Sequence, residues 1–166
     1  MSAMRINGLS EQDAYAALEH CCVSRRWISA MIDKKPFSSE VELRELSDIA
    51  WSECEEDDWL EAFEGHPRIG DVQSLKAKYA GTSSLAASEQ SGMESADDTV
   101  IERLARGNQQ YEERFGFIFI VCATGKTALE MCELLEARLA NTRAEELRIA
   151  AEEQRKITQL RLENLL

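Results

Sequence analysis

The most apolar run of the chain is RFGFIFIVCA, from Arg114 to Ala123. It is too short to cross a bilayer, which takes about 20 apolar residues, and it is typical of extended or fully buried chain. A single strand cannot pair with itself, and no second segment of the sequence has a β pattern. We therefore expect an all-α fold with a short extended apolar segment packed in its centre.

Apolar residues at helical spacing flank this run on both sides. Hydroxyl residues suited to helix N-caps precede several of these segments, namely Ser10, Ser38 or Ser39, and Thr127. The expected helices cover residues 11–23, 27–32, 40–53, 57–63, 71–79, 97–114, 129–139 and 145–165, with one or two helical turns near 86–92.

Length and composition favour one ordinary globular domain over residues 1–166. Apolar residues make up 44% of the chain, and none of their runs approaches the length of a membrane span. The first residues lack the apolar core of a signal peptide, and the last residues are not a peroxisomal address. We expect a cytoplasmic protein.

Nineteen basic and thirty-one acidic residues give a net charge of −12. This charge repels phosphate backbones and anionic lipid, so nucleic acid and membranes are not expected partners. An anionic small substrate requires a cation placed locally against this field. The five cysteines are odd in number and contain no Cys-x-x-Cys, which favours reduced, mostly buried thiols over disulfides or a zinc site.

One of the two histidines lies in the stretch EGHPRIGD, from Glu64 to Asp71. Pro67 disfavours helix at His66, and Gly65 suits a left-handed cap for the helix before it. An imidazole on a turn-rich connection is well placed to meet a ligand. The alternative is that His66 merely marks a helix end.

Two further sites are open to two interpretations. Glu89 and Gln90 form either a solvent-facing dipeptide or part of a site. Arg161 ends a stripe on the last helix, where its guanidinium either pairs with an acid or faces a pocket as a fixed cation for a carboxylate. That stripe comprises Leu147, Ala150, Gln154, Ile157 and Arg161.

Two metal or nucleotide motifs are excluded. The acid-rich segment before His66 lacks the alternating ligands of an EF-hand loop. Gly125-Lys126-Thr127 ends like a phosphate-binding loop, yet Ile120 stands where that loop requires its first glycine.

Six motifs follow one another in a recognisable order and spacing. They are His66-Pro67-x-Ile69-Gly70, Glu89-Gln90, Asn108-x-x-Tyr111-x-x-Arg114-Phe115-Gly116-Phe117, Gly125-Lys126-Thr127, Arg138-Leu139-x-Asn141 and Ile157-x-x-Leu160-Arg161-Leu162. Together, from about residue 8 to residue 166, the chain resembles the 2-oxo-4-hydroxy-4-carboxy-5-ureidoimidazoline (OHCU) decarboxylases, which catalyse the last step from urate to allantoin.

The resemblance implies an all-α homodimer of eight or more helices and a carboxy-lyase that uses no metal or organic cofactor. It places the catalytic histidine at His66 and includes Glu89, together with Gln90, among the residues that contact the substrate. It assigns substrate contacts to the following residues: Pro67, Gln90, the backbone of Phe117, Ile118, Phe119, Ile120 and Val121, and Arg161. The helix around 99–106 and the last helix both offer apolar surface for self-association.

Two positions depart from the family pattern. Ala86 stands where family members often have serine, and Ile118 where they often have proline. If a hydroxyl is needed, Ser84 or Ser88 would supply it.

Loss of carbon dioxide from a hydroxyl-bearing carbon leaves an electron pair, and a proton must then return to one face of the adjacent carbon. We expect His66 to exchange this proton with the substrate hydroxyl or carbon. Glu89 is expected to orient and polarise the His66 ring. Gln90 would hold the ureido or ring amide, and Arg161 would bind the carboxylate or ring oxygen. Protonation on one face predicts (S)-allantoin alone.

Two rival interpretations remain. A non-catalytic helical interaction domain would bind a basic partner through its acidic faces and leave His66, Glu89 and Arg161 on separate surfaces. A thiol-dependent enzyme would use Cys122, but burial in the apolar run should make that thiol inert.

Overall fold

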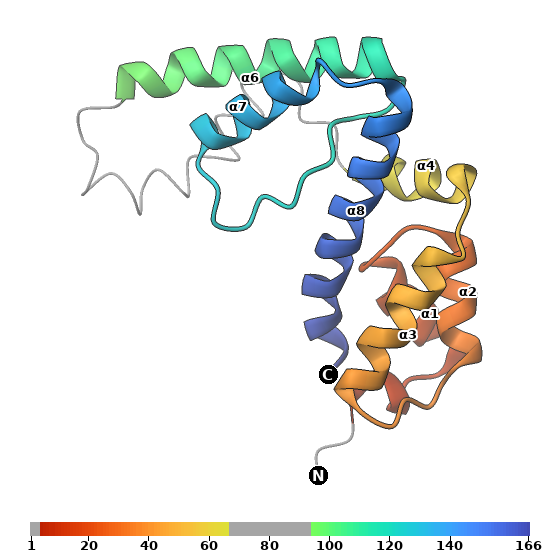
Figure 1. Cartoon of the computed structure of the whole chain (residues 1–166). Coiled ribbons are helices and arrows are strands. Elements are labelled where there is room, and N and C mark those ends of the chain that lie inside the picture. Colours follow the sequence, from red (N-terminus) through yellow and green to blue (C-terminus); the bar gives the residue numbers. More distant parts are fainter. Residues whose placement is uncertain (1–3, 67–93) are drawn as a thin grey trace. The chain divides into compact units, whose positions relative to one another are not determined.

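The computed structural model describes residues 4–66 and 94–166, and all regular secondary structure within them is helical (Figure 1). The all-α prediction is confirmed. The expected helix at 71–79 and the turns near 86–92 lie outside the described residues. The observed elements are the 3₁₀ helix η1 (Arg5–Gly8), α1 (Glu11–Glu19), α2 (Arg25–Asp33), α3 (Glu40–Ser52), α4 (Glu56–Glu64), α6 (Glu94–Phe115), α7 (Ala128–Arg138), α8 (Arg143–Arg161) and the 3₁₀ helix η2 (Leu162–Leu165).

The described residues form two compact units. Unit 1 comprises residues 4–66, 120–122 and 147–166, and unit 2 comprises residues 94–119 and 123–146. The assignment of residues 1–166 to one domain stays a prediction.

Side-chain caps set where the helices of unit 1 begin. The hydroxyl oxygens of Ser10 and Ser39 accept hydrogen bonds from backbone N–H groups in the first turns of α1 and α3, as predicted. Ser24 caps α2 in the same way, with φ −111° and ψ 117°. α1 was expected to run to residue 23 but ends at Glu19, and the N–H groups of Cys21 and Cys22 both donate to the carbonyl of Leu18 beyond its last turn.

Two buried tryptophan side chains form hydrogen bonds across the core of unit 1. Helices α1, α2 and α3 pack together in this unit (Figure 1). The Nε1 of Trp27 donates to the carbonyl of Ser47, and the Nε1 of Trp51 donates to the carbonyl of Ala151. Both side chains are buried, so each indole N–H has the partner that burial requires. The second bond ties α3 to α8 within this unit.

Gly65 does not form the predicted left-handed cap. Its φ of −70° and ψ of −13° are right-handed, and its N–H donates to the carbonyl of Ala62. What the position requires is space, because a Cβ at Gly65 would lie 2.4 Å from Cγ2 of Val23. The close approach of these two segments fixes the direction in which the chain leaves α4.

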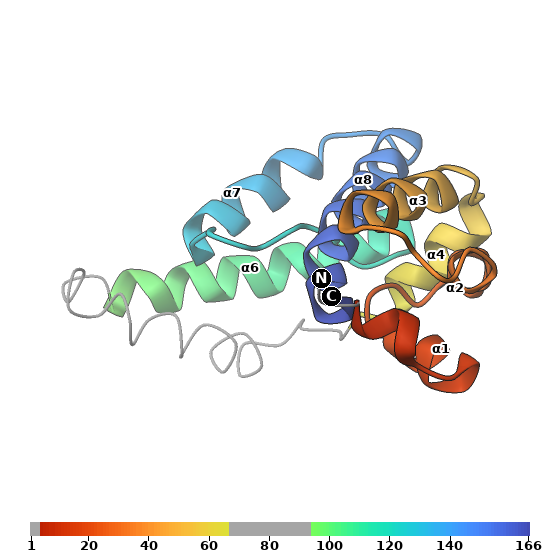
Figure 2. The ribbon, with the colours of Figure 1, turned by 90° about the horizontal axis from the view of Figure 1, so that it is seen from below.

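In unit 2, α6 and α7 lie side by side in both views (Figures 1 and 2). A Cβ at Gly107 of α6 would lie 2.7 Å from Cδ2 of Leu135 in α7, so glycine permits this close packing. Thr127 caps α7 as predicted, by accepting from the N–H of Glu130.

Unit 2 also contains a buried network of charged and polar side chains around Glu146. Glu146 is fully buried and accepts hydrogen bonds from the hydroxyl of Tyr111 (2.5 Å), Nε of Arg138 (2.7 Å) and Nδ2 of Asn141 (2.8 Å). Burial, followed by the bond to Glu146, raises the pKa of Tyr111 and keeps its hydroxyl a donor.

Residues 116–127 form neither helix nor strand and connect α6 to α7. Gly116 turns the chain at the end of α6 with φ of +82°, which glycine adopts without strain. In unit 2, the ring of Phe119 lies under the guanidinium of Arg138 (4.6 Å), and the ring of Phe117 meets the edge of Tyr111 (5.8 Å). The charge network therefore holds residues 117–119 in place.

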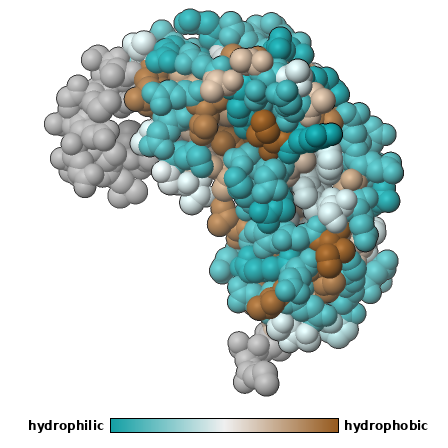
Figure 3. All heavy atoms as spheres, viewed as in Figure 1, coloured by the Kyte–Doolittle hydropathy of each residue, from teal (hydrophilic) through white to brown (hydrophobic). Residues whose placement is uncertain are grey.

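The surface is largely polar, as expected for a chain in which 30% of the residues are charged. The face in Figure 3 is mostly hydrophilic, with smaller apolar patches. Within residues 4–66 and 94–166, every helix is too short or too polar to cross a membrane.

Candidate active site

His66 follows directly on α4, and its ring is half-buried in unit 1. Its backbone N–H donates to the carbonyl of Phe63 (3.2 Å), which extends the last turn of α4. The ring nitrogen Nε2 lies 2.6 Å from Oε1 of Gln154, on α8. The helix end and the partner on α8 together fix this imidazole.

Gln154 is the site residue that sequence reasoning missed. It was counted in the stripe of the last helix, but no role was assigned to it. Its side chain is 1% exposed, and its Nε2 donates to Oγ1 of Thr158 (3.1 Å), one turn further along α8. An amide among buried apolar positions needs polar partners, and that requirement was the available signal.

Arg161 lies near the carboxyl end of α1. Its Nη1 donates to the carbonyl of His20 (3.4 Å), where the helix end carries partial negative charge. Within residues 4–66 and 94–166, Arg161 makes no ion pair with a carboxylate, and its role as a fixed cation stays a prediction. Seven residues separate Gln154 from Arg161, which is two turns or about 10 Å along one face of α8. The imidazole and the guanidinium are thus presented on the same side of this helix.

The apolar segment also reaches α8 within unit 1. The N–H of Cys122 donates to Oε1 of Glu153 (3.0 Å), and Oε2 of Glu153 accepts from Nζ of Lys156 (2.7 Å). Cys122 is thereby held to Glu153, the residue that precedes Gln154 on α8. Of the predicted backbone contacts, Ile120 and Val121 belong to this unit, whereas Phe117, Ile118 and Phe119 belong to unit 2.

The remaining predicted site residues, Pro67, Glu89 and Gln90, lie outside the described residues, as do Ser84, Ala86 and Ser88. Of the three side chains expected to converge, His66 and Arg161 both lie in unit 1, and their convergence on one site stays a prediction.

Cys122 was expected to be buried in the apolar run, but its side chain is only half-buried. It lies at the edge of the segment that Glu153 fastens, which leaves part of its surface accessible. The other four cysteines are buried as expected, and all five are reduced thiols.

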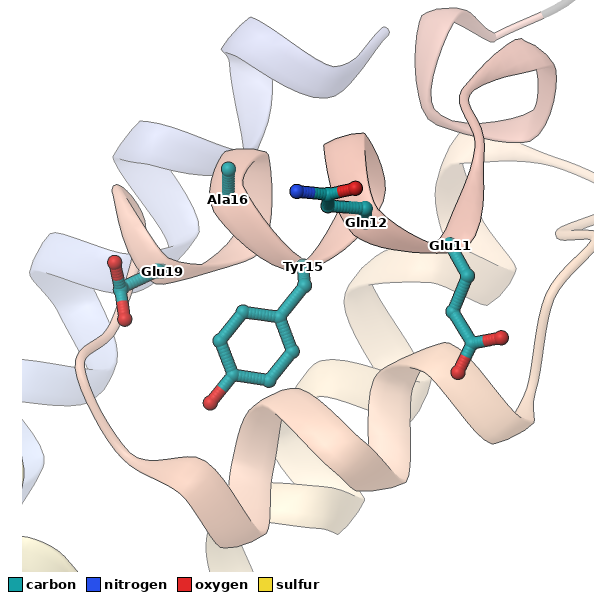
Figure 4. Close-up of a pocket in the computed structure, with 5 residues that line it drawn as sticks. All are labelled: Glu11, Gln12, Tyr15, Ala16 and Glu19. Atoms are coloured by element: carbon teal, nitrogen blue, oxygen red, sulfur yellow. The ribbon is translucent and has the colours of Figure 1, made fainter.

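A surface hollow of about 570 Å³ lies elsewhere on unit 1, along the outer side of α1 (Figure 4). Its lining comes from this one helix, with Glu11 and Glu19 at its two ends and Tyr15 between them. No candidate site residue lines it, and its carboxylates would repel an anionic substrate. The part of the chain that the structure describes holds no cluster of His, Cys, Asp and Glu suited to a metal ion.

Comparison with known proteins supports the family expected from the motifs. The sequence model of the family described as OHCU decarboxylase matches residues 7–163. The uric acid degradation bifunctional protein TTL of Arabidopsis thaliana is 38% identical over 148 residues, which cover 87% of this chain and 45% of that protein. The 2-oxo-4-hydroxy-4-carboxy-5-ureidoimidazoline decarboxylase of Amia calva is 37% identical over 101 residues, 61% of this chain and 57% of that protein. The chain thus spans about half the length of these curated relatives.

A crystal structure of an OHCU decarboxylase in the presence of (S)-allantoin has the same fold, with a TM-score of 0.72. The two sequences are 32% identical, and the match covers 95% of this chain and 98% of the other. The chain therefore belongs to the OHCU decarboxylase family.

Proposed function

We propose that the chain decarboxylates 2-oxo-4-hydroxy-4-carboxy-5-ureidoimidazoline to (S)-allantoin in urate degradation. Family membership over residues 7–163 supports this reaction class. The observation that carries the proposal is the placement of His66 and Arg161 relative to one face of α8, where an acid/base and a cation can act on one small anion.

Each group has a role in this reaction. Arg161 binds the substrate carboxylate or ring oxygen, and the carbonyl of His20 restrains its guanidinium. His66 takes the proton from the substrate hydroxyl or returns one to the carbanion carbon after carbon dioxide leaves. The electron pair delocalises into the adjacent ring unit, so the proposed reaction needs no metal or organic cofactor.

The proposal keeps the other residues that the resemblance assigns. Glu89 orients and polarises His66, Gln90 holds the ureido or ring amide, and Pro67 borders the substrate. The backbone of residues 117–121 also contacts the substrate. Within unit 1, the Glu153 carboxylate holds the N–H of Cys122, which follows residues 120 and 121.

The proposed setting is a cytoplasmic homodimer in which residues 1–166 form one domain. Five reduced thiols suit a reducing compartment, and the net charge of −12 suits a protein that binds neither nucleic acid nor membrane. Sedimentation equilibrium of the full chain tests the dimer, and a single species with the mass of one chain would contradict it.

The decisive assay supplies freshly made substrate and follows optical activity. Spontaneous decay gives both enantiomers of allantoin, so the proposal predicts faster conversion and an excess of the (S) form when the chain is added. A product mixture identical to that of the enzyme-free reaction would refute the proposal.

Arg161→Lys tests the cation directly. Lysine keeps the charge but loses the planar fork that matches a carboxylate, so we expect kcat/KM to fall about tenfold or more. Arg148→Lys is the matched control, since Arg148 lies exposed on the same helix. Equal kinetic constants for the two variants would remove Arg161 from the site.

A further inference from the structure

Residues 20–25 form the α1–α2 turn, which is hydrogen-bonded to two other helices of unit 1. From α4, the carboxylate of Glu61 accepts from the backbone N–H of Arg25 (2.7 Å) and from its Nε (3.0 Å). From α8, Nη1 of Arg161 donates to the carbonyl of His20 (3.4 Å). The turn therefore joins α4, which leads to the proposed acid/base, to α8, which carries the proposed cation.

The bond between Glu61 and the backbone of Arg25 is the stronger part of this contact. Arg25 is the first residue of α2, and its N–H is one of the four that a helix leaves without an internal acceptor. The positive end of the helix dipole further favours a carboxylate at this place. The side chain of Arg25 is 82% exposed, so its ion pair with Glu61 contributes little by itself. Glu61 is thus bonded to the main chain of the turn.

A second contact joins the same face of α4 to the turn. Gly65 follows Glu61 by four residues, which is about one helical turn, and a Cβ at Gly65 would lie 2.6 Å from Cβ of Val23. Helix α4 therefore meets the turn at two points, at Arg25 through Glu61 and at Val23 through Gly65. His66 is the next residue, and its N–H donates to the last turn of α4. A displacement of α4 at these points would also displace His66.

We propose that Glu61 is a positioning residue, which holds α4 to the α1–α2 turn and thereby sets the place of His66 relative to Arg161. This inference rests on the proposed function and adds to it a residue that needs no contact with the substrate. Gln154 bonds the ring of His66 from α8, whereas Glu61 sets the backbone from which the ring extends. Displacing a reacting group by about 1 Å costs up to about 10²-fold in rate.

Glu61→Ala removes both bonds to Arg25. We expect kcat to fall about tenfold or more, because His66 is displaced from the bound substrate. KM should change less, since the carbonyl of His20 still restrains Arg161. Glu61→Gln keeps one oxygen that accepts from the N–H of Arg25, so it should restore most of the lost kcat. A native kcat in Glu61→Ala would overturn the inference.

A shorter side chain provides a second variant in case Glu61→Ala does not fold. Glu61→Asp keeps the charge but has one methylene less, so its carboxylate reaches the N–H of Arg25 only if α4 moves. We expect kcat to fall in this variant as well, again with a smaller change in KM. A native kcat in Glu61→Asp would also overturn the inference.

The place of His66 can be followed without turnover. The sequence has only two histidines, so His20→Asn assigns the ring signals in ¹H–¹³C spectra of the full chain. We expect Glu61→Ala to shift the ring signals of His66, and Glu61→Gln to leave them close to those of the native chain. Unshifted signals of His66 in Glu61→Ala would overturn the inference.

Arg26→Ala is the matched control between the same two helices. It removes the ion pair of Arg26 with Asp58 (3.3 Å), in which the arginine side chain is 52% exposed, and leaves the bonds of Glu61 intact. We expect native kinetic constants and native signals of His66. An equal loss of kcat in Arg26→Ala and Glu61→Ala would mean that any contact between α2 and α4 has this effect, which contradicts a specific role for Glu61.

The two proposals fail separately. A chain in which Glu61→Ala shifts the signals of His66, but whose native form gives no excess of (S)-allantoin, would refute the decarboxylase and support the hold of Glu61 on His66. An active decarboxylase whose kcat and His66 signals stay native in Glu61→Ala would refute the role of Glu61 alone.

Discussion

Burial at single residues decides which groups can do chemistry. Cys21, Cys22 and Cys54 all lie in the core of unit 1, where burial raises the pKa of Cys22 to about 12 and those of Cys21 and Cys54 to about 11. Thiols that stay protonated near neutral pH are poor nucleophiles. These three cysteines are therefore structural, although Cys21 lies close to Arg161.

This burial predicts a loss of stability in alkali. Unfolded thiols ionise near pH 9, whereas the folded ones keep their protons up to about pH 11 or 12. Their contribution to the free energy of unfolding is complete below about pH 9 and declines as the pH rises toward those values. Urea unfolding between about pH 8 and pH 10.5 measures it. Cys22→Val should lose less stability over this range than the native chain, and an equal or steeper loss in the variant would contradict the assignment.

Residue patterns predicted the position of His66 but not its partner. Pro67 and the acidic helix before it were enough to place the imidazole at a helix end. Gln154 is 88 residues away along the chain, and nothing in local spacing relates the two side chains.

The sequence also indicated a special role for Gly65, but the predicted reason was wrong. Glycine is needed there to make room for Val23, and not to adopt a positive φ.

At the scale of elements, one buried carboxylate joins three helices. Glu146 in the first turn of α8 accepts from Tyr111 of α6 and Arg138 of α7 within unit 2. Arg138 also lies over the ring of Phe119, so the network reaches the connection that is proposed to border the substrate. Removing the Arg138 charge would leave the buried Glu146 carboxylate without its cationic partner.

Arg138→Met should therefore lower the free energy of unfolding by about 3–5 kcal/mol, measured by urea unfolding. The double variant Arg138→Met/Glu146→Leu should be less destabilised than the single variant, because it removes both charges. Arg103→Met is the control, since the Arg103–Glu136 pair is 37% and 44% exposed and such pairs contribute about 0–1 kcal/mol. Equal losses for Arg138→Met and Arg103→Met would show that burial does not set the strength of the network.

Helix starts were more predictable than helix ends. Ser10, Ser39 and Thr127 each cap the helix that the sequence assigned to them, because a cap depends on residues three positions apart. The end of α1 was predicted about four residues too late. The segment between α1 and α2 instead closes a turn in which Cys21 and Cys22 donate to the carbonyl of Leu18, and no cap residue in the sequence marks that turn.

At the scale of the whole molecule, an acidic protein is proposed to bind an anion. The net charge of −12 opposes such a substrate at long range, so the proposed binding depends on a local cation, for which Arg161 is the candidate. Composition and helical periodicity predicted the fold class, and ordered motifs predicted the family. The convergence of His66, Glu89 and Arg161 stays a proposal that comes from the family resemblance, since periodicity says nothing of contacts between segments far apart in the chain.

Single-turnover conversion of freshly made substrate by the native chain and by His66→Ala tests the central claim most directly. Circular dichroism of the product gives the excess of (S)-allantoin at each time. If His66 is the acid/base, the native chain gives (S)-allantoin almost alone, and His66→Ala slows the reaction by about 10²–10⁴-fold, toward the mixture formed spontaneously. Single-handed allantoin formed by His66→Ala at the native rate would contradict the claim.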